Sequence, residues 1–135
     1  MQKVICCRLR RGQDLLGEIR AIAAEQGLQG AVIASAVGCL SRACLRDASG
    51  LRVRQVEEPC EILNLTGTVS AARFHLHLSL AKEDLSAIGG HLMPGCLVNT
   101  TCELVLLETG WRFGVGEDPK TGYDEVIFLP GEEIE

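Results

Sequence analysis

The sequence predicts an α+β fold: a single compact domain in which an antiparallel β-sheet packs against one main helix. Three observations lead to this fold class. Residues 14–26 repeat their apolar positions at helical spacing. Most other apolar segments are rich in β-branched residues and end at turn residues, as strands do. The chain of 135 residues has the length of one domain, so we expect residues 1–135 to fold as a unit.

The first two expected elements are a strand and a helix. The segment KVICCRLRRG, residues 3–12, is rich in β-formers and ends at a glycine, which predicts a strand. A helix of about three turns follows, because Asp14 fits the N-cap and Gly27 fits the C′ position. Its apolar stripe consists of Leu15, Ile19 and Ile22. Such a stripe needs a surface to cover, and the strands of the remaining chain provide one.

Strands dominate the rest of the chain. They are expected at residues 31–46, 51–58, 60–70, 72–81, 96–109, 111–115 and 125–129. Gly38 indicates a bend or bulge in the first of these strands, or a break between two shorter ones. Turns at 47–50 and 70–73 join neighbouring strands into two hairpins. We expect residues 82–95 to form a loop with at most one helical turn, and a last turn around 118–124.

Composition narrows the class of protein. The net charge of −5 and the pI of about 5.2 disfavour a nucleic-acid binder, which normally carries a basic surplus. No apolar run approaches the roughly 18 residues of a membrane span, and the N-terminus does not have the pattern of a signal peptide. We therefore expect a cytoplasmic protein without a membrane partner.

The seven cysteines contain no C-x-x-C pair, so the usual spacing of a structural zinc site is missing. Their number is odd, and most of them lie in apolar segments. We expect them to be reduced and buried, acting as small hydrophobic residues.

All three histidines of the chain, His75, His77 and His91, fall within residues 74–92. On a strand, the first two project from one face, about 6 to 7 Å apart. The third follows two glycines, which allow the backbone to approach another strand closely. Three imidazoles with one open position are how a catalytic zinc site is built. The spacing alone leaves a second interpretation open, because H-x-H is also common on half-exposed strands.

Four carboxylates are candidates for a supporting group or a general base beside the histidines. They are Glu61, Glu83, Asp84 and Glu103. Glu61 and Glu103 fall on strands that could neighbour the histidine strand. The pattern assigns no catalytic residue.

Several motifs together resemble one family. In order they are RLRRGQDLL (8–16), SAVGCLSRACLR, EILNLTGTVS, FHLHLSLAKEDLSAIGGHLMPGCLV and TTCELVLLE. The chain resembles the plants-and-prokaryotes-conserved (PPC) domain, in its stand-alone prokaryotic type, from about residue 4 to residue 130. The most specific part of the resemblance is His75-Leu76-His77 followed by Gly89-Gly90-His91-Leu92-Met93-Pro94-Gly95.

The resemblance implies a strongly curved antiparallel sheet with a helix packed on it, and assembly as a homotrimer. It also implies that His75, His77 and His91 are metal ligands, for zinc or another divalent transition metal. Plant members place a Gly-Arg-Phe ahead of Glu-Ile-Leu for partner contacts; this chain has Glu58-Pro59-Cys60 there, so that role is not expected. The AT-hook of plant members, an Arg-Gly-Arg-Pro core, is missing from this sequence, so we do not expect the chain alone to bind DNA.

Two classes of function follow. The first is a metal-binding protein, including a metal-dependent enzyme that acts on a small-molecule ligand near the metal. The alternative is an oligomeric binding or regulatory module. The DNA-binding function associated with the family belongs to this second class.

Overall fold

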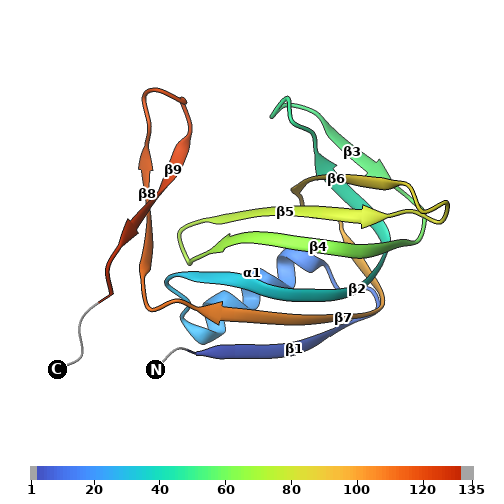
Figure 1. Ribbon diagram of the computed structural model, residues 1–135, viewed down its shortest axis with the longest axis horizontal. Helices are drawn as coiled ribbons and strands as arrows, with labels where there is room; N and C mark the ends of the chain where they lie inside the picture. The colour runs from blue at the N-terminus through green and yellow to red at the C-terminus, as the bar shows by residue number, and fades with distance from the viewer. Residues whose placement is uncertain (1–2, 132–135) are drawn as a thin grey trace.

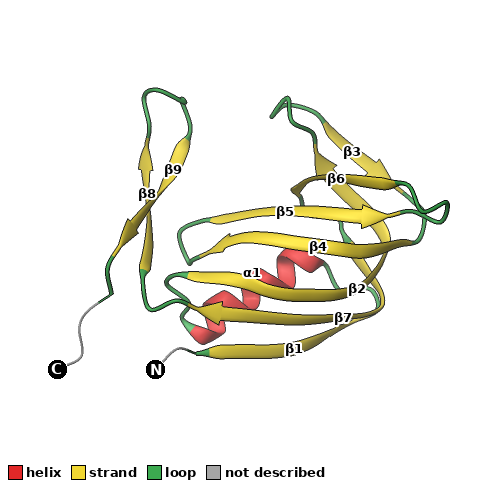
Figure 2. Cartoon of the chain, viewed as in Figure 1, coloured by secondary structure: helices red, strands yellow, loops and turns green. Residues whose placement is uncertain are grey.

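The described part of the chain contains nine strands and one helix. The computed structural model describes residues 3–131 (Figure 1). In chain order the elements are β1 (Val4–Arg10), α1 (Leu15–Gln26), β2 (Ala31–Arg46), β3 (Val53–Val56), β4 (Cys60–Val69), β5 (Phe74–Ala81), β6 (Ala87–Leu92), β7 (Leu97–Glu108), β8 (Arg112–Glu117) and β9 (Asp124–Leu129). The fold is mostly antiparallel sheet with one helix, as Figure 2 shows.

The helix begins and ends where the sequence predicts. The carboxylate of Asp14 accepts a hydrogen bond from the backbone N–H of Gly17, and Gly27 takes the left-handed conformation with φ of 60°. The buried face of α1 is made of Leu15, Leu16, Ile19 and Ala23, and Ile22 packs at its border. These side chains belong to the same apolar core as the sheet, so burial against the strands stabilises the helix.

Seven strands form one sheet that curls back on itself. Its order is β1-β7-β2-β4-β5-β6, and β3 pairs with β2 off this path. The far end of β2 also pairs with β6, through Leu45 opposite Leu92 and Arg46 opposite His91. Strands β2, β4, β5 and β6 therefore close a ring around part of the core, which explains the strong curvature visible in Figure 1.

Strand β2 can serve several neighbours because it is long and irregular. It runs unbroken over sixteen residues, with register shifts against β7 on both sides of its centre. Gly38 lies at one of these shifts with φ of 156°, and an added Cβ there would collide with the backbone of Thr101. The expected bend at Gly38 is thus a bulge within one strand.

The segment expected to be a loop, residues 82–95, contains strand β6. The turn from Lys82 to Ser86 is short, and β6 then pairs with β5 along five residues. Ala, Gly and Gly within β6 concealed the strand, because none of them is a typical β-former. The prediction of a loop there was wrong for residues 87–92.

The strands β8 and β9 form a separate two-stranded sheet and do not extend the main one. In Figure 1 this hairpin stands apart from the curled sheet. Its base is joined to the rest of the chain by the backbone N–H of Phe113, which donates to the carbonyl of Gln29. Within the hairpin, Phe113 packs edge-to-face on Phe128. The expected turn around residues 118–124 joins the two strands.

The cysteines are all free thiols within the described residues. Four of them are buried, namely Cys44, Cys60, Cys96 and Cys102. Burial raises the pKa of Cys96 and of Cys102 to about 11, so both stay protonated as small apolar groups. Cys6 is exposed, contrary to the expectation of burial. Within residues 3–131, no helix is long and apolar enough to span a membrane.

Candidate metal centre

Side chains along β5 point alternately to the two faces of the sheet, so its histidines and its leucines lie on opposite faces. Leu76 and Leu78 are buried in the core, at 1% and 2% exposure. His75 and His77 lie between and beside them on the strand and therefore project from the opposite, outer face. This part of the predicted geometry is confirmed.

The third histidine arrives through β6. In the register of β5 with β6, His77 is directly opposite His91. Gly90 makes the approach of β6 to β2 possible, because a Cβ at this position would lie 2.7 Å from the carbonyl oxygen of Arg46. Only a residue without a side chain permits this contact, so the two glycines ahead of His91 do what their pattern predicted.

The three imidazoles converge. Each offers one ring nitrogen, and these three atoms lie within 4.8 Å of one another. The ring centroids are 5.0 Å apart for His75 and His77, 5.8 Å for His75 and His91, and 5.7 Å for His77 and His91. Tetrahedral ligands of zinc lie about 3.4 Å apart, so small side-chain rotations would bring the nitrogens to that separation.

The electrostatics of the site keep two of these rings neutral. Burial, together with the positive charge of Arg46, lowers the pKa of His91 to about 4. Burial and the nearby guanidinium of Arg73 lower the pKa of His75 as well, while Glu125 opposes this shift. A neutral imidazole has a free lone pair, which is the form that binds a metal.

Two observations bear on how well the rings fit a metal ion. The Nδ1 atom of His91 is buried and has no hydrogen-bond partner among residues 3–131. A buried polar atom without a partner is costly, and one bond, such as coordination, would satisfy it. In contrast, the guanidinium of Arg73 donates to Nδ1 of His75 at 3.2 Å, which places the proton of that ring on Nε2. Coordination by His75 therefore requires Arg73 to turn away.

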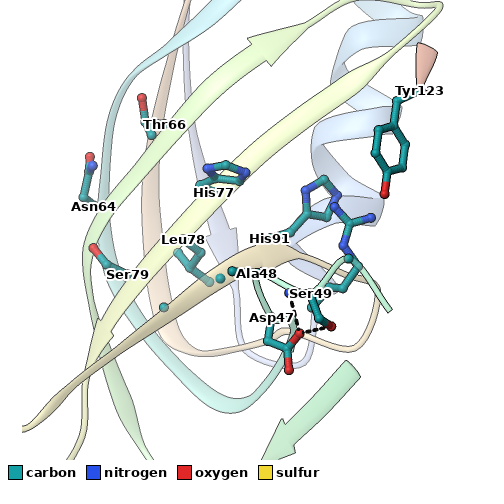
Figure 3. A pocket seen from close by; sticks show the side chains of 14 residues that line it. Asp47, Ala48, Ser49, Asn64, Thr66, His77, Leu78, Ser79, His91 and Tyr123 are labelled. Carbon is teal, nitrogen blue, oxygen red and sulfur yellow. Dashed lines mark hydrogen bonds between the residues drawn. The ribbon is translucent and has the colours of Figure 1, made fainter. Parts of the chain in front are cut away.

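A cavity of about 620 Å³ adjoins the histidines, with His77 and His91 in its wall. Its other polar lining residues are Arg46, Asp47, Ser49, Asn64, Thr66, Ser79 and Tyr123. In Figure 3 Tyr123, from the turn of the β8–β9 hairpin, stands at one side of the cavity, across from His77. The same hydroxyl would lie 3.4 Å from a Cβ added at Gly50, in the turn between β2 and β3. Two segments far apart in the sequence thus border the cavity.

The four carboxylates predicted as supporting groups lie elsewhere. Glu61 and Glu83 line a second cavity beside Cys39. Asp84 accepts hydrogen bonds from Ser86 in its own turn, and Glu103 lies on β7 opposite Arg8 and Val37. None of the four lines the cavity at the histidines.

The acidic groups near the site are instead Asp47 and Glu125. Asp47 lines the cavity, but its carboxylate is engaged by Ser49, as Figure 3 shows, and by Arg54 at 3.7 Å. Glu125 acts on the pKa of His75 from β9. Sequence reasoning missed both, together with Arg46 and Tyr123, because each reaches the site by pairing or folding between distant segments.

Comparison with known proteins gives one family match. The model of the Plants and Prokaryotes Conserved (PCC) domain matches residues 1–110. The β8–β9 hairpin, which contributes Tyr123, lies beyond the matched residues.

Three relatives illustrate the range of the match. A bifunctional protein GlmU from Synechococcus sp. is 43% identical over 129 residues, which are 95% of this chain but only 20% of that protein. The chain thus spans about a fifth of the length of this curated relative. A hypothetical protein from Salmonella has the same fold with a TM-score of 0.93 and 31% identity, covering 96% of this chain and 95% of that one. A metal-containing protein from Archaeoglobus fulgidus superposes with a TM-score of 0.78 and 30% identity, covering 93% of each chain.

Proposed function

The chain belongs to the Plants and Prokaryotes Conserved domain family, and we propose that it is a metal-binding member of that family. In this proposal His75, His77 and His91 hold zinc or another divalent transition metal. The convergence of three ring nitrogens within 4.8 Å carries the proposal. The name of the Archaeoglobus protein, which contains a metal, supports it from outside the chain.

The metal site in this proposal is open. A structural zinc is usually closed by four protein ligands, whereas a catalytic one has three and keeps a position for water or substrate. The described residues supply three candidate ligands, and a cavity of about 620 Å³ adjoins them. A metal ion bound there would act as a Lewis acid or lower the pKa of a bound water. We therefore favour a site that binds a small molecule, including as a metal-dependent enzyme, over a purely structural metal.

Assembly as a homotrimer is the second part of the proposal, and it rests on the family resemblance and on exposed apolar side chains. Val37 on β2 and Leu63 on β4 are each 56% exposed. They flank the pair of Gly38 with Ile62, in which Ile62 is buried, so both project from the outer face of the sheet. Apolar residues in this position fit an interface between subunits.

DNA binding is a function associated with the family, but the net charge of this chain does not support it. The chain carries a net charge of −5, and the phosphate backbone favours basic partners. The alternative of a regulatory binding module differs from the metal proposal in one measurable respect, namely that it needs no metal.

The proposal is tested by the metal content of the purified protein. Protein without a polyhistidine tag is analysed by mass spectrometry beside the double variant His75→Ala/His77→Ala. The matched control is Thr66→Ala, since Thr66 lies opposite His77 on β4 and offers no imidazole. We expect close to one zinc per chain in the wild type and the control, and none in the double variant. A wild type that remains free of metal after incubation with zinc would overturn the proposal.

A further inference from the structure

A single row of side chains crosses four strands at the candidate metal centre. Thr66 on β4 lies opposite His77 on β5, His77 lies opposite His91 on β6, and His91 lies opposite Arg46 on β2. Directly opposed residues in antiparallel strands point to the same face, with Cβ atoms about 4.5 to 5.5 Å apart. The guanidinium of Arg46 is therefore built into the same surface as two of the candidate metal ligands.

Arg46 is a cation that lacks a protein anion. Its Nε atom is buried without a hydrogen-bond partner, and Arg46 forms no ion pair among residues 3–131. The neighbouring carboxylate of Asp47 is bound to Ser49 and Arg54. Glu125 is close enough to affect His75, but it forms no ion pair with Arg46. Arginine is the side chain best shaped to hold a carboxylate or phosphate with two parallel hydrogen bonds.

A metal ion bound by the histidines would add a second positive charge and so increase the preference of the site for an anion. Arg46 lies directly opposite His91, and two cationic centres side by side repel each other. An oxyanion placed between the metal and Arg46 would neutralise both. A metal ion and the guanidinium of Arg46 would therefore together favour a negatively charged ligand.

The remaining wall of the cavity indicates what the anion is attached to. Besides Arg46 and the histidines, the wall offers hydroxyl or amide groups from Ser49, Asn64, Thr66, Ser79 and Tyr123. Gly89 and Gly90 add no side chain to the wall next to them. A volume of about 620 Å³ is far larger than an inorganic anion and matches the size of small-molecule sites in general. The groups present would hydrogen-bond a hydroxylated body.

We infer that the cavity binds a small hydroxylated organic oxyanion, with its phosphate or carboxylate held between the metal ion and Arg46 and with Tyr123 closing the site over it. This inference rests on the proposed metal site and names the class of ligand that the site takes. The hairpin that carries Tyr123 lies beyond residues 1–110, which the family model matches.

The test measures binding of three probes to the zinc-loaded protein by isothermal titration calorimetry. Glucose 6-phosphate carries a phosphate, gluconate carries a carboxylate, and glucose carries neither. We expect one or both anionic probes to bind and glucose to show no measurable heat. The anionic probe that binds more tightly identifies the oxyanion, and equal binding of all three probes would overturn the inference.

Variants locate the anion. Arg46→Gln is expected to weaken binding of the anionic probe at least about ten-fold while zinc stays bound, because a charge-assisted hydrogen bond is lost. Arg46→Lys, which keeps the charge but not the fork, should retain part of the affinity and shows whether the site is folded. The matched control is Arg52→Gln, a residue outside the cavity wall, which should bind as the wild type does. Equal affinity of the Arg46→Gln and Arg52→Gln proteins would contradict the inference.

Zinc content, measured on the same samples, separates the two proposals. If zinc is bound and no anionic probe binds, the ligand class is wrong and the metal site stands. If the wild type takes up no zinc, the metal site is wrong and the inference that rests on it falls too.

Discussion

Arg46 and His91 lie directly opposite each other where the end of β2 pairs with β6. This pairing closes the sheet and at the same time places the guanidinium of Arg46, whose Nε atom is buried, beside a candidate metal ligand. Burial is the main cause of the lowered pKa of His91, and the positive charge of Arg46 beside the ring acts in the same direction. The contact that completes the fold therefore also helps to keep His91 in the neutral form that binds a metal.

The pH dependence of stability follows from this neutral ring in the metal-free protein. Folded His91 has a pKa of about 4, whereas a histidine in the unfolded chain titrates near 6.5. Between these values the unfolded state binds more protons, so the free energy of unfolding falls as the pH decreases from about 6.5 to about 4. His75, whose pKa is also lowered, adds to the same trend.

Urea unfolding in the presence of a chelator, from pH 7.5 to pH 4.5, measures this trend. The variant His91→Gln removes the group and should lose less stability over the same range. Identical pH profiles for the wild type and His91→Gln would show that His91 does not titrate as its surroundings require.

Removing Arg73 is expected to strengthen metal binding. Its guanidinium donates to Nδ1 of His75 at 3.2 Å and adds positive charge near the rings. Arg73→Gln removes this charge and weakens the competing hydrogen bond, so zinc affinity should rise by about two- to five-fold. Competition with a chromophoric chelator measures the dissociation constant, and Arg52→Gln controls for the loss of one positive charge. A weaker affinity in Arg73→Gln would mean that Arg73 orients His75 for the metal instead of blocking it.

A methyl group at Gly90 should damage both the fold and the site. The added Cβ would lie 2.7 Å from the carbonyl oxygen of Arg46, so β6 must move away from β2 and carry His91 with it. We expect Gly90→Ala to cost about 1–3 kcal/mol of stability and to lower zinc affinity. At Gly114 the nearest atom to an added Cβ is at 3.6 Å, an ordinary contact.

Gly114→Ala is therefore the matched control for the effect of an alanine in a strand. Thermal melting and zinc titration of both variants separate the two effects. If Gly90→Ala melts and binds zinc as Gly114→Ala does, the close approach of β6 to β2 is not needed for the site.

Subunit assembly is expected to depend on the exposed apolar side chains of the outer face. In the proposed homotrimer, lysine at Val37 and at Leu63 would place two charges in the subunit interface, so the double variant Val37→Lys/Leu63→Lys should shift the mass from trimer toward monomer. Light scattering coupled to size-exclusion chromatography measures the mass. Leu85→Lys is the control, because Leu85 is 85% exposed in the turn before β6. An unchanged mass for the double variant would place the interface on another surface.

Local pattern was sufficient to predict the elements that depend on near neighbours in the chain. The helix of residues 15–26 has its cap at Asp14 and its end at Gly27 because both signals act within one turn. The alternation of β5, with Leu76 and Leu78 inside and the histidines outside, follows from the two-residue period of a strand. The same locality explains the error at β6, where small residues carry little strand signal and pairing with β5 and β2 creates the strand.

The sequence therefore contains in itself the identity of the three histidines, the face on which two of them lie, and the two glycines that let the third approach. Its local pattern does not indicate which other residues surround the three histidines in the folded protein. Arg46 joins the site because the end of β2 pairs with β6 across more than forty residues of chain, and Tyr123 joins it because a hairpin from the C-terminal segment folds toward the turn after β2. Glu61 and Glu103, which the strand order suggested, lie away from it. Periodicity acts over a few residues, so it predicts which residues share a face of one strand. Strand register is set by burial of the whole core, so the neighbours from distant strands could not be predicted from local pattern.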